Sequence, residues 1–373
     1  MPNKKPKKSQ KKTSAKSSAK TTQSGLRKEL RTGHEDNLEP LESLDITKIK
    51  DFDDMLKAMS KTSFGGRLVG EAADVMYEMF TDKDCFKVMT LSGAMTAGKM
   101  SLLVCEMIDR GFVDCIISTG ALMAHGLVES LGMLHFKYDP HTSTKEDTDL
   151  YYKGYDRIYD TLELEKNLDD TAEIMKDIFE GISTSQILSS HWLGDKIGEY
   201  LAKNFEGKGI LRQAHLKKVP VFIPAFTDSE IGLDVGTFNR DLKDAGKKPY
   251  KFDPYLDLEK YTGLIEANET LGIFTVGGGV PRNWAQQAGP YLDIIGKRVS
   301  GEDVFRRFKY GVRICPEPVQ WGGLSGCTYS EGISWGKFMP PEEGGRFSEV
   351  LSDATVVWPL LLKGVVQRIE KAG

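Results

Sequence analysis

The chain has 373 residues, of which 40% are hydrophobic and 28% are charged, with a formal net charge of −4. This composition is typical of a globular protein, and the length suffices for one large α/β domain. The longest apolar runs span only a few residues, so we expect no membrane-spanning helix and no membrane contact. No apolar segment follows the basic N-terminus as a secretory signal would require, so we expect a cytoplasmic protein.

Residues 1–24 differ in composition from the rest of the chain, because they hold eight lysines and no acidic residue. Without them, 42 basic and 54 acidic residues leave a charge of −12. The segment is of low complexity and almost without apolar residues, which predicts a disordered lysine-rich tail. We interpret it as a solubilising extension, although lysine runs also bind nucleic acid without specificity. Residues 25–373 are expected to form a single domain.

Short β-type runs alternate with amphipathic helical segments after the tail. Residues 39–80 predict two helices separated by a break at Gly65 and Gly66. Strands are predicted at 85–91, 113–119, 219–226, 272–279 and 310–316, and helices at 97–111, 123–131, 255–272 and 360–373. Alternation of this kind is typical of βαβ units, so we predict a mainly parallel sheet covered by helices on both faces.

Two further patterns bear on the organisation of the chain. Residues 138–167 are polar and weakly periodic, which predicts a long surface excursion. The five cysteines show no CxxC spacing and the six histidines show no HxxxH or HExxH pattern. We therefore expect reduced, buried thiols and no metal site.

Small and hydroxyl residues follow three of the predicted strands, where doubly wound sheets bind ligands. They are Ser92 and Gly93, Thr119 and Gly120, and the triple glycine 277–279, which includes Gly278. Glycines at such points let the backbone approach a phosphate closely, and helix N-terminal amides can face it. No GxGxxG motif is present, so glycine at an ordinary tight turn remains an equal alternative.

Three other polar residues stand near predicted strand ends. Asp228 follows the run at 219–226, and Asp353 opens the segment that precedes the last helix. Each aspartate could cap a helix or hold a ribose hydroxyl. His125 is the one histidine beside a predicted strand end.

The segment "TYSEGISWGKF", residues 328–338, combines Lys337 with Trp335 and Glu331. A lysine becomes a nucleophile when desolvation or a neighbouring positive charge keeps its amine partly neutral. A tryptophan can exclude water and offer a π face to a cation, and a glutamate can pair with a charged amine. These residue types fit imine chemistry on an amine substrate. The alternative is a lysine whose stem lies along a core tryptophan while its amine reaches water.

The segment "EGISWGK" resembles the active-site lysine signature of the deoxyhypusine synthase family. Further stretches resemble that family in the same order and extend from residue 63 to the last helix. They are "SFGGRLVGEAAD", "SGAMTAG", "VDCIISTGA", "IYDTLELEKNLDD", "VPVFIPAFTDSEIG", "FTVGGGV" and "SDATVVWPLL". The resemblance implies an α/β fold with a Rossmann-like, doubly wound, mainly parallel sheet, assembled as a homotetramer with active sites at dimer interfaces.

The resemblance also implies a chemistry and a set of site residues. Such enzymes use NAD to oxidise spermidine, pass its aminobutyl group to a lysine as a Schiff base (an imine), and transfer it to an acceptor amine. The acceptor is a lysine of the translation factor eIF5A, or putrescine in homospermidine-forming relatives. Lys337 matches the covalent lysine, Trp335 the cation-facing ring and Glu331 a substrate carboxylate. The positions that match NAD-binding residues are Ser92, Thr119, Asp228, Gly278, Asp353 and Ala354.

The chain departs from the family pattern around the expected amine pocket. Asn283 stands where the proton-handling histidine is expected, and Ala124 and His125 replace paired glutamates. Leu324 occupies an acidic position, and an aspartate of the "TDGSLGD"-type turn is displaced by one residue to Asp234. Because charge-assisted contacts contribute about 1.5–3 kcal/mol each, these losses should weaken binding of a multiply charged amine.

We therefore expect family chemistry on a different, polyamine-like amine pair. The substrate-binding candidates are Trp335, Glu331, His125, Asp234 and Asn283. Modification of eIF5A itself is the alternative, and a non-catalytic NAD-binding member is a third.

Overall fold

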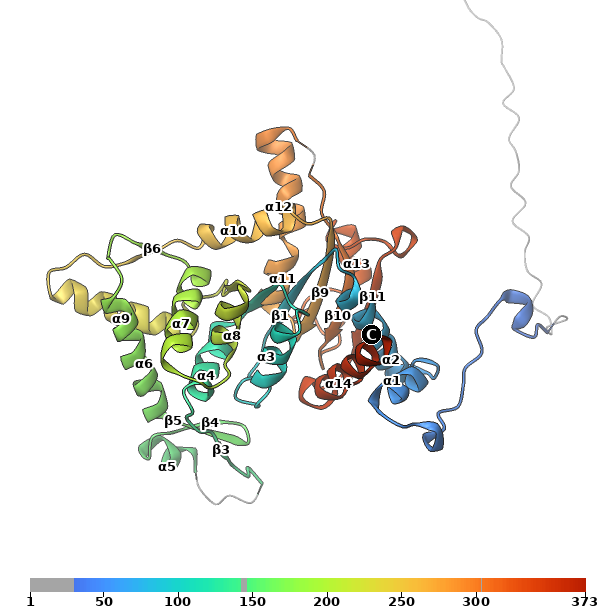
Figure 1. The fold of residues 1–373 in the computed structure, drawn as a ribbon, viewed down its shortest axis with the longest axis horizontal. Helices are drawn as coiled ribbons and strands as arrows, with labels where there is room; N and C mark the ends of the chain where they lie inside the picture. The colour runs from blue at the N-terminus through green and yellow to red at the C-terminus, as the bar shows by residue number, and fades with distance from the viewer. Residues whose placement is uncertain (1–29, 142–145, 303) are drawn as a thin grey trace, which may run out of the picture. The chain divides into compact units, whose positions relative to one another are not determined.

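A computed structural model describes residues 30–141, 146–302 and 304–373 (Figure 1). The chain divides into two units, Met1–Leu41 and Glu42–Gly373. The described part of the first unit holds one short helix, η1 (His34–Asp36). The lysine-rich segment 1–24, predicted to be a disordered tail, lies outside the described residues.

The second unit is built on a six-stranded sheet in which every neighbouring pair is parallel. The order across the sheet is β11 (Arg346–Val350), β10 (Phe308–Ile314), β9 (Thr270–Val276), β1 (Cys85–Leu91), β2 (Cys115–Ser118) and β7 (Val221–Phe222). The chain runs outward from β1 to β2 and β7, then returns to the other side of β1 and continues through β9, β10 and β11. The direction of winding therefore reverses between β1 and β9, which is where ligands bind in doubly wound sheets.

Helices cover both faces of this sheet, as the sequence predicts. Side chains alternate along each strand, so that Phe274 and Val276 join one core cluster and Ile273 joins the other. The first cluster packs against α1 (Phe52–Ser60), α2 (Phe64–Thr81), α3 (Ser101–Asp109), α4 (Gly120–Ser130) and α14 (Ala354–Ala372). The second packs against α10 (Tyr255–Glu266), α11 (Gly279–Gln286), α12 (Ala288–Ile295) and α13 (Tyr329–Ser334). This is an α/β fold with a mainly parallel sheet.

Further helices extend the first core cluster beyond the β7 edge. They are α6 (Glu165–Glu180), α7 (Ser190–Asn204), α8 (Ile210–Lys217) and α9 (Glu230–Asp244), with the two-stranded sheet β6 (Ile187–Leu188) and β8 (Lys251–Phe252) (Figure 1). Single turns complete the unit at η2 (Ile46–Lys48), η3 (Gly296–Ser300) and η4 (Pro341–Glu343). No helix in the described ranges is long and apolar enough to cross a membrane.

Three local predictions are corrected. The break between the first two helices falls at residues 61–63, so Gly65 and Gly66 lie in the first turn of α2, where amides have no intrahelical partner. Strand β7 is only two residues long because Pro220 and Pro224 flank it and cannot donate ladder hydrogen bonds. Strand β11 has no counterpart in the sequence prediction, because its polar residues suit a sheet edge.

The described residues of the predicted excursion at 138–167 form structure of their own. They contain α5 (Asp147–Tyr152) and two strands, β4 (Tyr155–Ile158) and β5 (Thr161–Leu164). These strands pair antiparallel with each other, and β5 also pairs with β3 (Phe136–Lys137). The segment is therefore a small β-sheet that buries Glu163.

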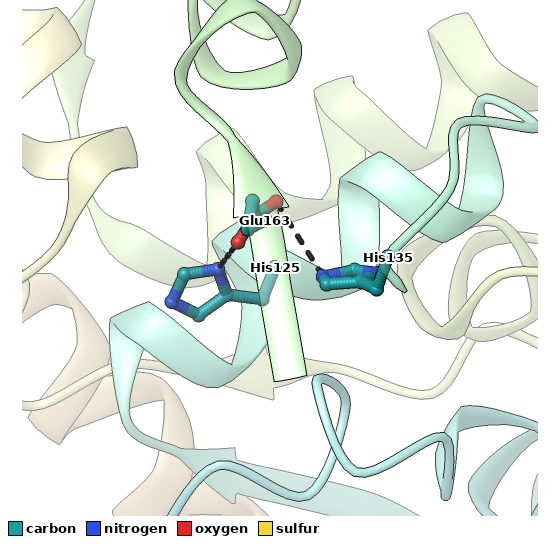
Figure 2. A group of neighbouring side chains, drawn as sticks. All are labelled: His125, His135 and Glu163. Carbon is teal, nitrogen blue, oxygen red and sulfur yellow. Dashed lines mark hydrogen bonds and ion pairs between the residues drawn. The ribbon is translucent and has the colours of Figure 1, made fainter. Parts of the chain in front are cut away.

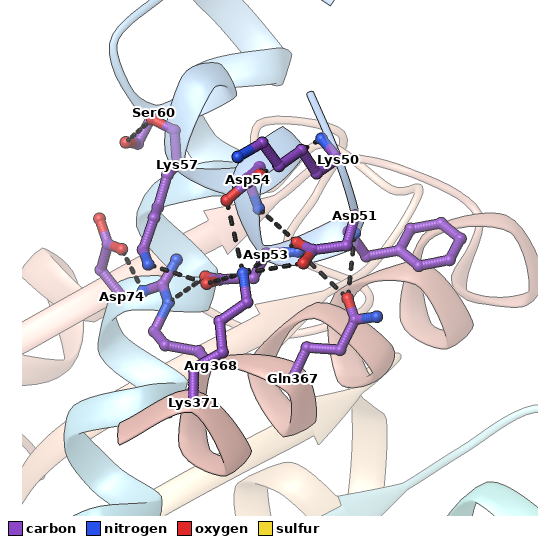
Figure 3. Close-up of polar contacts among 11 residues, drawn as sticks. Lys50, Asp51, Asp53, Asp54, Lys57, Ser60, Asp74, Gln367, Arg368 and Lys371 are labelled. Carbon is purple, nitrogen blue, oxygen red and sulfur yellow. Dashed lines mark hydrogen bonds and ion pairs between the residues drawn. The ribbon is translucent and has the colours of Figure 1, made fainter. Parts of the chain in front are cut away.

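A cluster of charged residues links α1, the first α-helix of this unit, to α14, the last (Figure 3). Asp53 on α1 is fully buried and accepts hydrogen bonds from Lys57, Arg368 and Lys371. Burial alone would raise the pKa of Asp53, but these three cations lower it to about 2. The cluster holds α1 and α14 together across one end of the sheet.

Candidate active site

The backbone of Lys337 is fixed between a short helix and a strand of the main sheet. Thr328 caps α13 by accepting a hydrogen bond from the Glu331 amide, and Gly336, at a φ of 70°, turns the chain after the helix. The Lys337 amide then donates to Gly332, and its carbonyl accepts from Phe308 on β10, at 3.1 and 3.0 Å. Both backbone polar groups of Lys337 are therefore hydrogen-bonded, and only its side chain is available for chemistry.

The Lys337 amine is removed from water. The residue is 7% exposed, and its Nζ donates a hydrogen bond of 3.1 Å to Oδ1 of Asn283 on α11. Burial lowers the pKa of Lys337, and the positive charge of Arg282 lowers it further, against the opposing effects of Cys327 and Glu331. Both conditions that make a lysine nucleophilic, desolvation and a nearby cation, are therefore present.

Arg282 is a buried component of this site that the sequence analysis did not single out. Its Nη1 donates a 2.7 Å hydrogen bond to the Cys327 carbonyl, and its guanidinium lies 5.4 Å from the centre of the Tyr329 ring. Its Nε and Nη2 are buried without a hydrogen-bond partner in the described chain. The only sequence signal was its place beside Asn283 in "VPRNW".

Trp335 and Glu331 do not cover the amine within one chain. Trp335 is 64% exposed, and Glu331 is exposed on the same short helix. An indole with this exposure cannot desolvate the Lys337 amine without a further covering surface. Trp335 and Glu331 lie close to Lys337 in sequence, but neither covers its amine within one chain.

The predicted cofactor-binding turns meet where the winding of the sheet reverses. The Ser92 amide donates to Val276 at 3.1 Å, and its hydroxyl donates to the Gly278 carbonyl at 2.5 Å. From the other side, Arg313 Nε donates to the Gly277 carbonyl and its Nη2 donates to Ser325. The triple-glycine turn after β9 is thus held on both sides.

Glycine is required at several of these positions for different reasons. A Cβ on Gly278 would lie 1.9 Å from the Ser325 carbonyl oxygen, and one on Gly120 would lie 2.3 Å from Ser229 Oγ. Gly93 and Gly279 have φ values of 77° and 63°, and Gly279 has open space where a Cβ would stand. The first two glycines permit close packing, while Gly93 and Gly279 leave the backbone accessible.

Two helices begin at this edge without a side-chain cap, because neither Thr119 before α4 nor Gly278 before α11 supplies one. The amide of Gly279, the first residue of α11, donates to the Ser325 carbonyl at 3.1 Å. The other first-turn amides of α11 and those of α4 can face an anion. Open backbone and uncapped helix N-termini at a winding reversal fit a phosphate-containing dinucleotide such as NAD.

The two aspartates predicted near the cofactor have different surroundings. Asp353 caps α14 by accepting hydrogen bonds from the Thr355 amide and hydroxyl, at 2.7 and 2.9 Å. Ala354 is the first residue of that helix. Asp228 is exposed, and its neighbour Ser229 caps α9 instead. Of the two roles considered for the aspartates, capping is therefore observed for Asp353 alone.

His125 and Asp234 lie far from Lys337 in the chain. His125 on α4 pairs with Glu163 on β5, and Glu163 also faces His135 (Figure 2). Asp234 lies on α9, where burial and then Glu230 raise its pKa to about 6. Figure 1 shows α9 on the β7 side of the sheet and α13 beside β10 and β11. One chain thus brings Asn283 to Lys337 but keeps His125 and Asp234 apart from them.

The protein therefore has an α/β fold, two uncapped helix N-termini at the winding reversal of its sheet, and a buried lysine, Lys337. A family model for deoxyhypusine synthase matches residues 54–365. "Probable deoxyhypusine synthase 2" of Methanosarcina acetivorans is 31% identical over 325 residues, covering 86% of this chain and 88% of that protein. Its namesake in Archaeoglobus fulgidus is 32% identical over 308 residues, covering 83% and 96%.

One further relative and one solved structure are also similar to this chain. "Deoxyhypusine synthase-like protein" of Chlorobaculum parvum is 30% identical over 325 residues, covering 87% of this chain and 88% of that protein. A crystal structure described as a "putative deoxyhypusine synthase" from Entamoeba histolytica superposes with a TM-score of 0.56 at 15% identity, covering 88% and 97%. The chain belongs to the deoxyhypusine synthase family.

Proposed function

We propose that this protein is an NAD-dependent transferase of alkyl groups. It moves an aminobutyl-type group from a polyamine-like donor to an acceptor amine through an imine on Lys337. The observation that carries the proposal is the buried Lys337 amine, whose recorded hydrogen-bond partner is the neutral amide of Asn283. A lysine with only a structural role would be expected to reach water or a carboxylate.

The proposed role of Lys337 is nucleophilic. NAD, when bound, accepts a hydride from the carbon beside a donor nitrogen and later returns it, so the overall reaction has no net redox change. Lys337 Nζ adds to the oxidised carbon, and the departing amine leaves with a proton. The acceptor amine then displaces Lys337, which regains its proton. Arg282 and burial keep the amine neutral enough for the first addition.

The residues that would hold NAD are those of the strand ends. The unbonded first-turn amides of α4 and α11 would hold the pyrophosphate, and Gly93 and Gly279 would allow close approach of the backbone. Ser92 and Arg313 hold the glycine turn in place. Asp228, Asp353 and Ala354 occupy the positions that match cofactor-binding residues of the family.

We place substrate contacts at an interface between copies of the chain. Large apolar side chains are exposed on α11 and on the segment that leads to Lys337, namely Val280, Phe305, Trp321, Leu324 and Trp335. A second copy covering them would shield the site from solvent and would supply His125 and Asp234. These exposed side chains support self-association, and we propose the homotetramer of the family, with shared sites, in a cytoplasmic enzyme.

The donor and acceptor are proposed as a small-amine pair that differs from spermidine and eIF5A. Asn283 and Leu324 remove ionisable groups near Lys337, which disfavours a donor of high positive charge. Transfer to a lysine of eIF5A, forming the hypusine precursor, is the second candidate, favoured by the names of the archaeal relatives.

The test is reductive trapping. The protein is incubated with NAD and a panel of diamines and polyamines, treated with borohydride, and analysed by intact-mass and peptide mass spectrometry. We expect an adduct on Lys337 in the wild type and none in Lys337→Arg, because arginine stays protonated.

The matched control is Lys87→Arg. Lys87 is also buried but is paired with Asp114 at 3.0 Å, so trapping should persist in that variant. An adduct that survives Lys337→Arg would refute the covalent role. Protein eIF5A added as acceptor separates the two candidate reactions.

A further inference from the structure

Three potential metal ligands meet within one chain, and two of them, His135 and Glu163, have no part in the proposed chemistry. His125 from α4, His135 from the residue before β3, and Glu163 from β5 present their ligand atoms within 4.8 Å of one another (Figure 2). The three residues come from separate elements, so no sequence spacing such as HxxxH could have indicated them.

Two buried atoms of this cluster lack a hydrogen bond. The side chain of Glu163 is fully buried, and that of His135 is 1% exposed. Glu163 Oε1 and His135 Nε2 are 3.5 Å apart, an ion pair if His135 is protonated, and neither atom has a hydrogen-bond partner in the described chain. A buried polar atom without a hydrogen bond costs about 1–3 kcal/mol, and a cation bound between the two atoms would satisfy both.

We propose that His125, His135 and Glu163 form a binding site for a zinc-type divalent cation. Two imidazoles and one carboxylate are a recognised zinc ligand set. Zinc–ligand bonds of about 2.0–2.2 Å separate neighbouring ligand atoms by about 3.5 Å, as His135 Nε2 and Glu163 Oε1 already are. Three protein ligands leave a fourth position for water or another small ligand.

The surroundings of His135 supply the outer contacts that such a site needs. Its Nδ1 lies 2.9 Å from Lys99 Nζ, which is also 3.8 Å from Oε1 of Glu129. Oε2 of Glu129 is buried without a partner. For Nε2 to bind a cation, the proton must lie on Nδ1, so Lys99, whose side chain is partly exposed, would have to move away from it. Glu129 is the neighbouring carboxylate that can accept this proton's hydrogen bond.

The competing explanation is a purely structural ion pair, in which a protonated His125 neutralises Glu163. That arrangement explains the contact of His125 with Glu163 Oε2. It also allows His135 Nε2 to approach Glu163 Oε1 at 3.5 Å, a separation longer than an ordinary hydrogen bond. The two explanations differ in whether His135 is needed for cation binding.

The experiment measures cation binding by the full chain without any enzymatic assay. The protein is stripped with a chelator, dialysed, and titrated with Zn²⁺, with bound metal measured by elemental analysis. Co²⁺ is titrated in parallel, and its visible absorption reports coordination by nitrogen and oxygen. We expect one equivalent of each ion per chain and a higher melting temperature with Zn²⁺.

His135→Ala and Glu163→Gln should each weaken Zn²⁺ binding at least tenfold. The control is His191→Ala, because His191 pairs with buried Asp257 at 2.8 Å but has no third ligand beside it among the described residues. Binding should be unchanged in that variant. If Glu163→Gln fails to fold, His135→Ala decides the question.

Three results would overturn the proposal. They are the absence of equimolar binding at micromolar free Zn²⁺, unchanged binding in His135→Ala, and equal loss in His191→Ala. Retention of the ion in every variant would place it elsewhere, for example at Asp51, Asp53 and Asp54, and would also overturn it.

Discussion

Lys337 Nζ donates a hydrogen bond of 3.1 Å to Oδ1 of Asn283, a residue 54 positions earlier in the chain. The partner is a neutral amide, so the hydrogen bond does not hold the amine in its charged form as a carboxylate would. The pKa of the amine stays lowered, and the amine can donate a hydrogen bond to Asn283 in either protonation state. The identity of residue 283 therefore controls the pH range in which Lys337 can react.

Asn283→Asp should shift this range upward. A carboxylate beside Lys337 favours the ammonium form and raises its pKa, by about 1–3 units for a close pair. The neutral amine, and with it imine formation, should then be lost at neutral pH and return only at higher pH. The measurement is the rate of borohydride-trapped adduct against pH. Asn283→His serves as the control. An unchanged dependence of the adduct rate on pH in Asn283→Asp would show that residue 283 does not affect the pKa of Lys337.

Trp335→Ala should weaken donor binding more than it slows chemistry. A cation held over an indole contributes about 0.5–2 kcal/mol, so KM for the donor should rise by roughly 2–30-fold while the Lys337 adduct still forms. Steady-state kinetics on the donor amine give KM and kcat separately. Tyr152→Ala removes another exposed aromatic ring, on α5, and should change neither constant. A fall in kcat alone would assign Trp335 a different role.

Gly278→Ala should abolish NAD binding. Its Cβ would lie 1.9 Å from the Ser325 carbonyl oxygen, so the turn between β9 and α11 must move. The readout is the rise in melting temperature produced by NAD, which should be present in the wild type and absent in the variant. Gly65→Ala is the control, because a Cβ there meets nothing within 4 Å. A normal NAD response in Gly278→Ala would remove this turn from the cofactor site.

Asp53→Asn should destabilise the fold by about 3 kcal/mol. The substitution leaves three cations without their shared carboxylate, and breaking a buried ion pair costs about 3–5 kcal/mol (Figure 3). Urea unfolding measures the loss. Asp51→Asn, at a partly exposed carboxylate beside Lys371, should cost less. Equal effects would show that Asp53 is not the centre of the cluster.

The same carboxylate predicts an acid-sensitive contribution to stability. The pKa of Asp53 is about 2 in the folded chain, below its unfolded value of about 3.9. Its stabilisation is therefore complete above the unfolded pKa and is lost as the pH falls toward 2. The difference in unfolding free energy between wild type and Asp53→Asn should shrink over that interval. A difference that stays constant down to pH 2 would contradict the assigned pKa.

The sequence predicted the elements whose side chains repeat regularly. The run "CFKVMTL" is β1, with the bounds Cys85–Leu91 that its apolar pattern indicated. Weakly apolar or interrupted segments were less predictable, as β7 and β11 show. Four of the five cysteines are buried and all five are unpaired, as expected from their apolar surroundings.

The sequence by itself determined the fold class and the family and singled out Lys337 as the candidate nucleophile, because these depend on local patterns and on motifs of adjacent residues. Only the tertiary structure decided which distant residues meet. It placed Asn283 and Arg282 beside Lys337, and it brought His135 and Glu163 to His125. Contacts between residues that are distant in sequence depend on how strands and helices pack. Burial then affects the pKa of each group and the partner with which it pairs. A side chain's chemistry is therefore fixed by neighbours that its sequence position does not reveal.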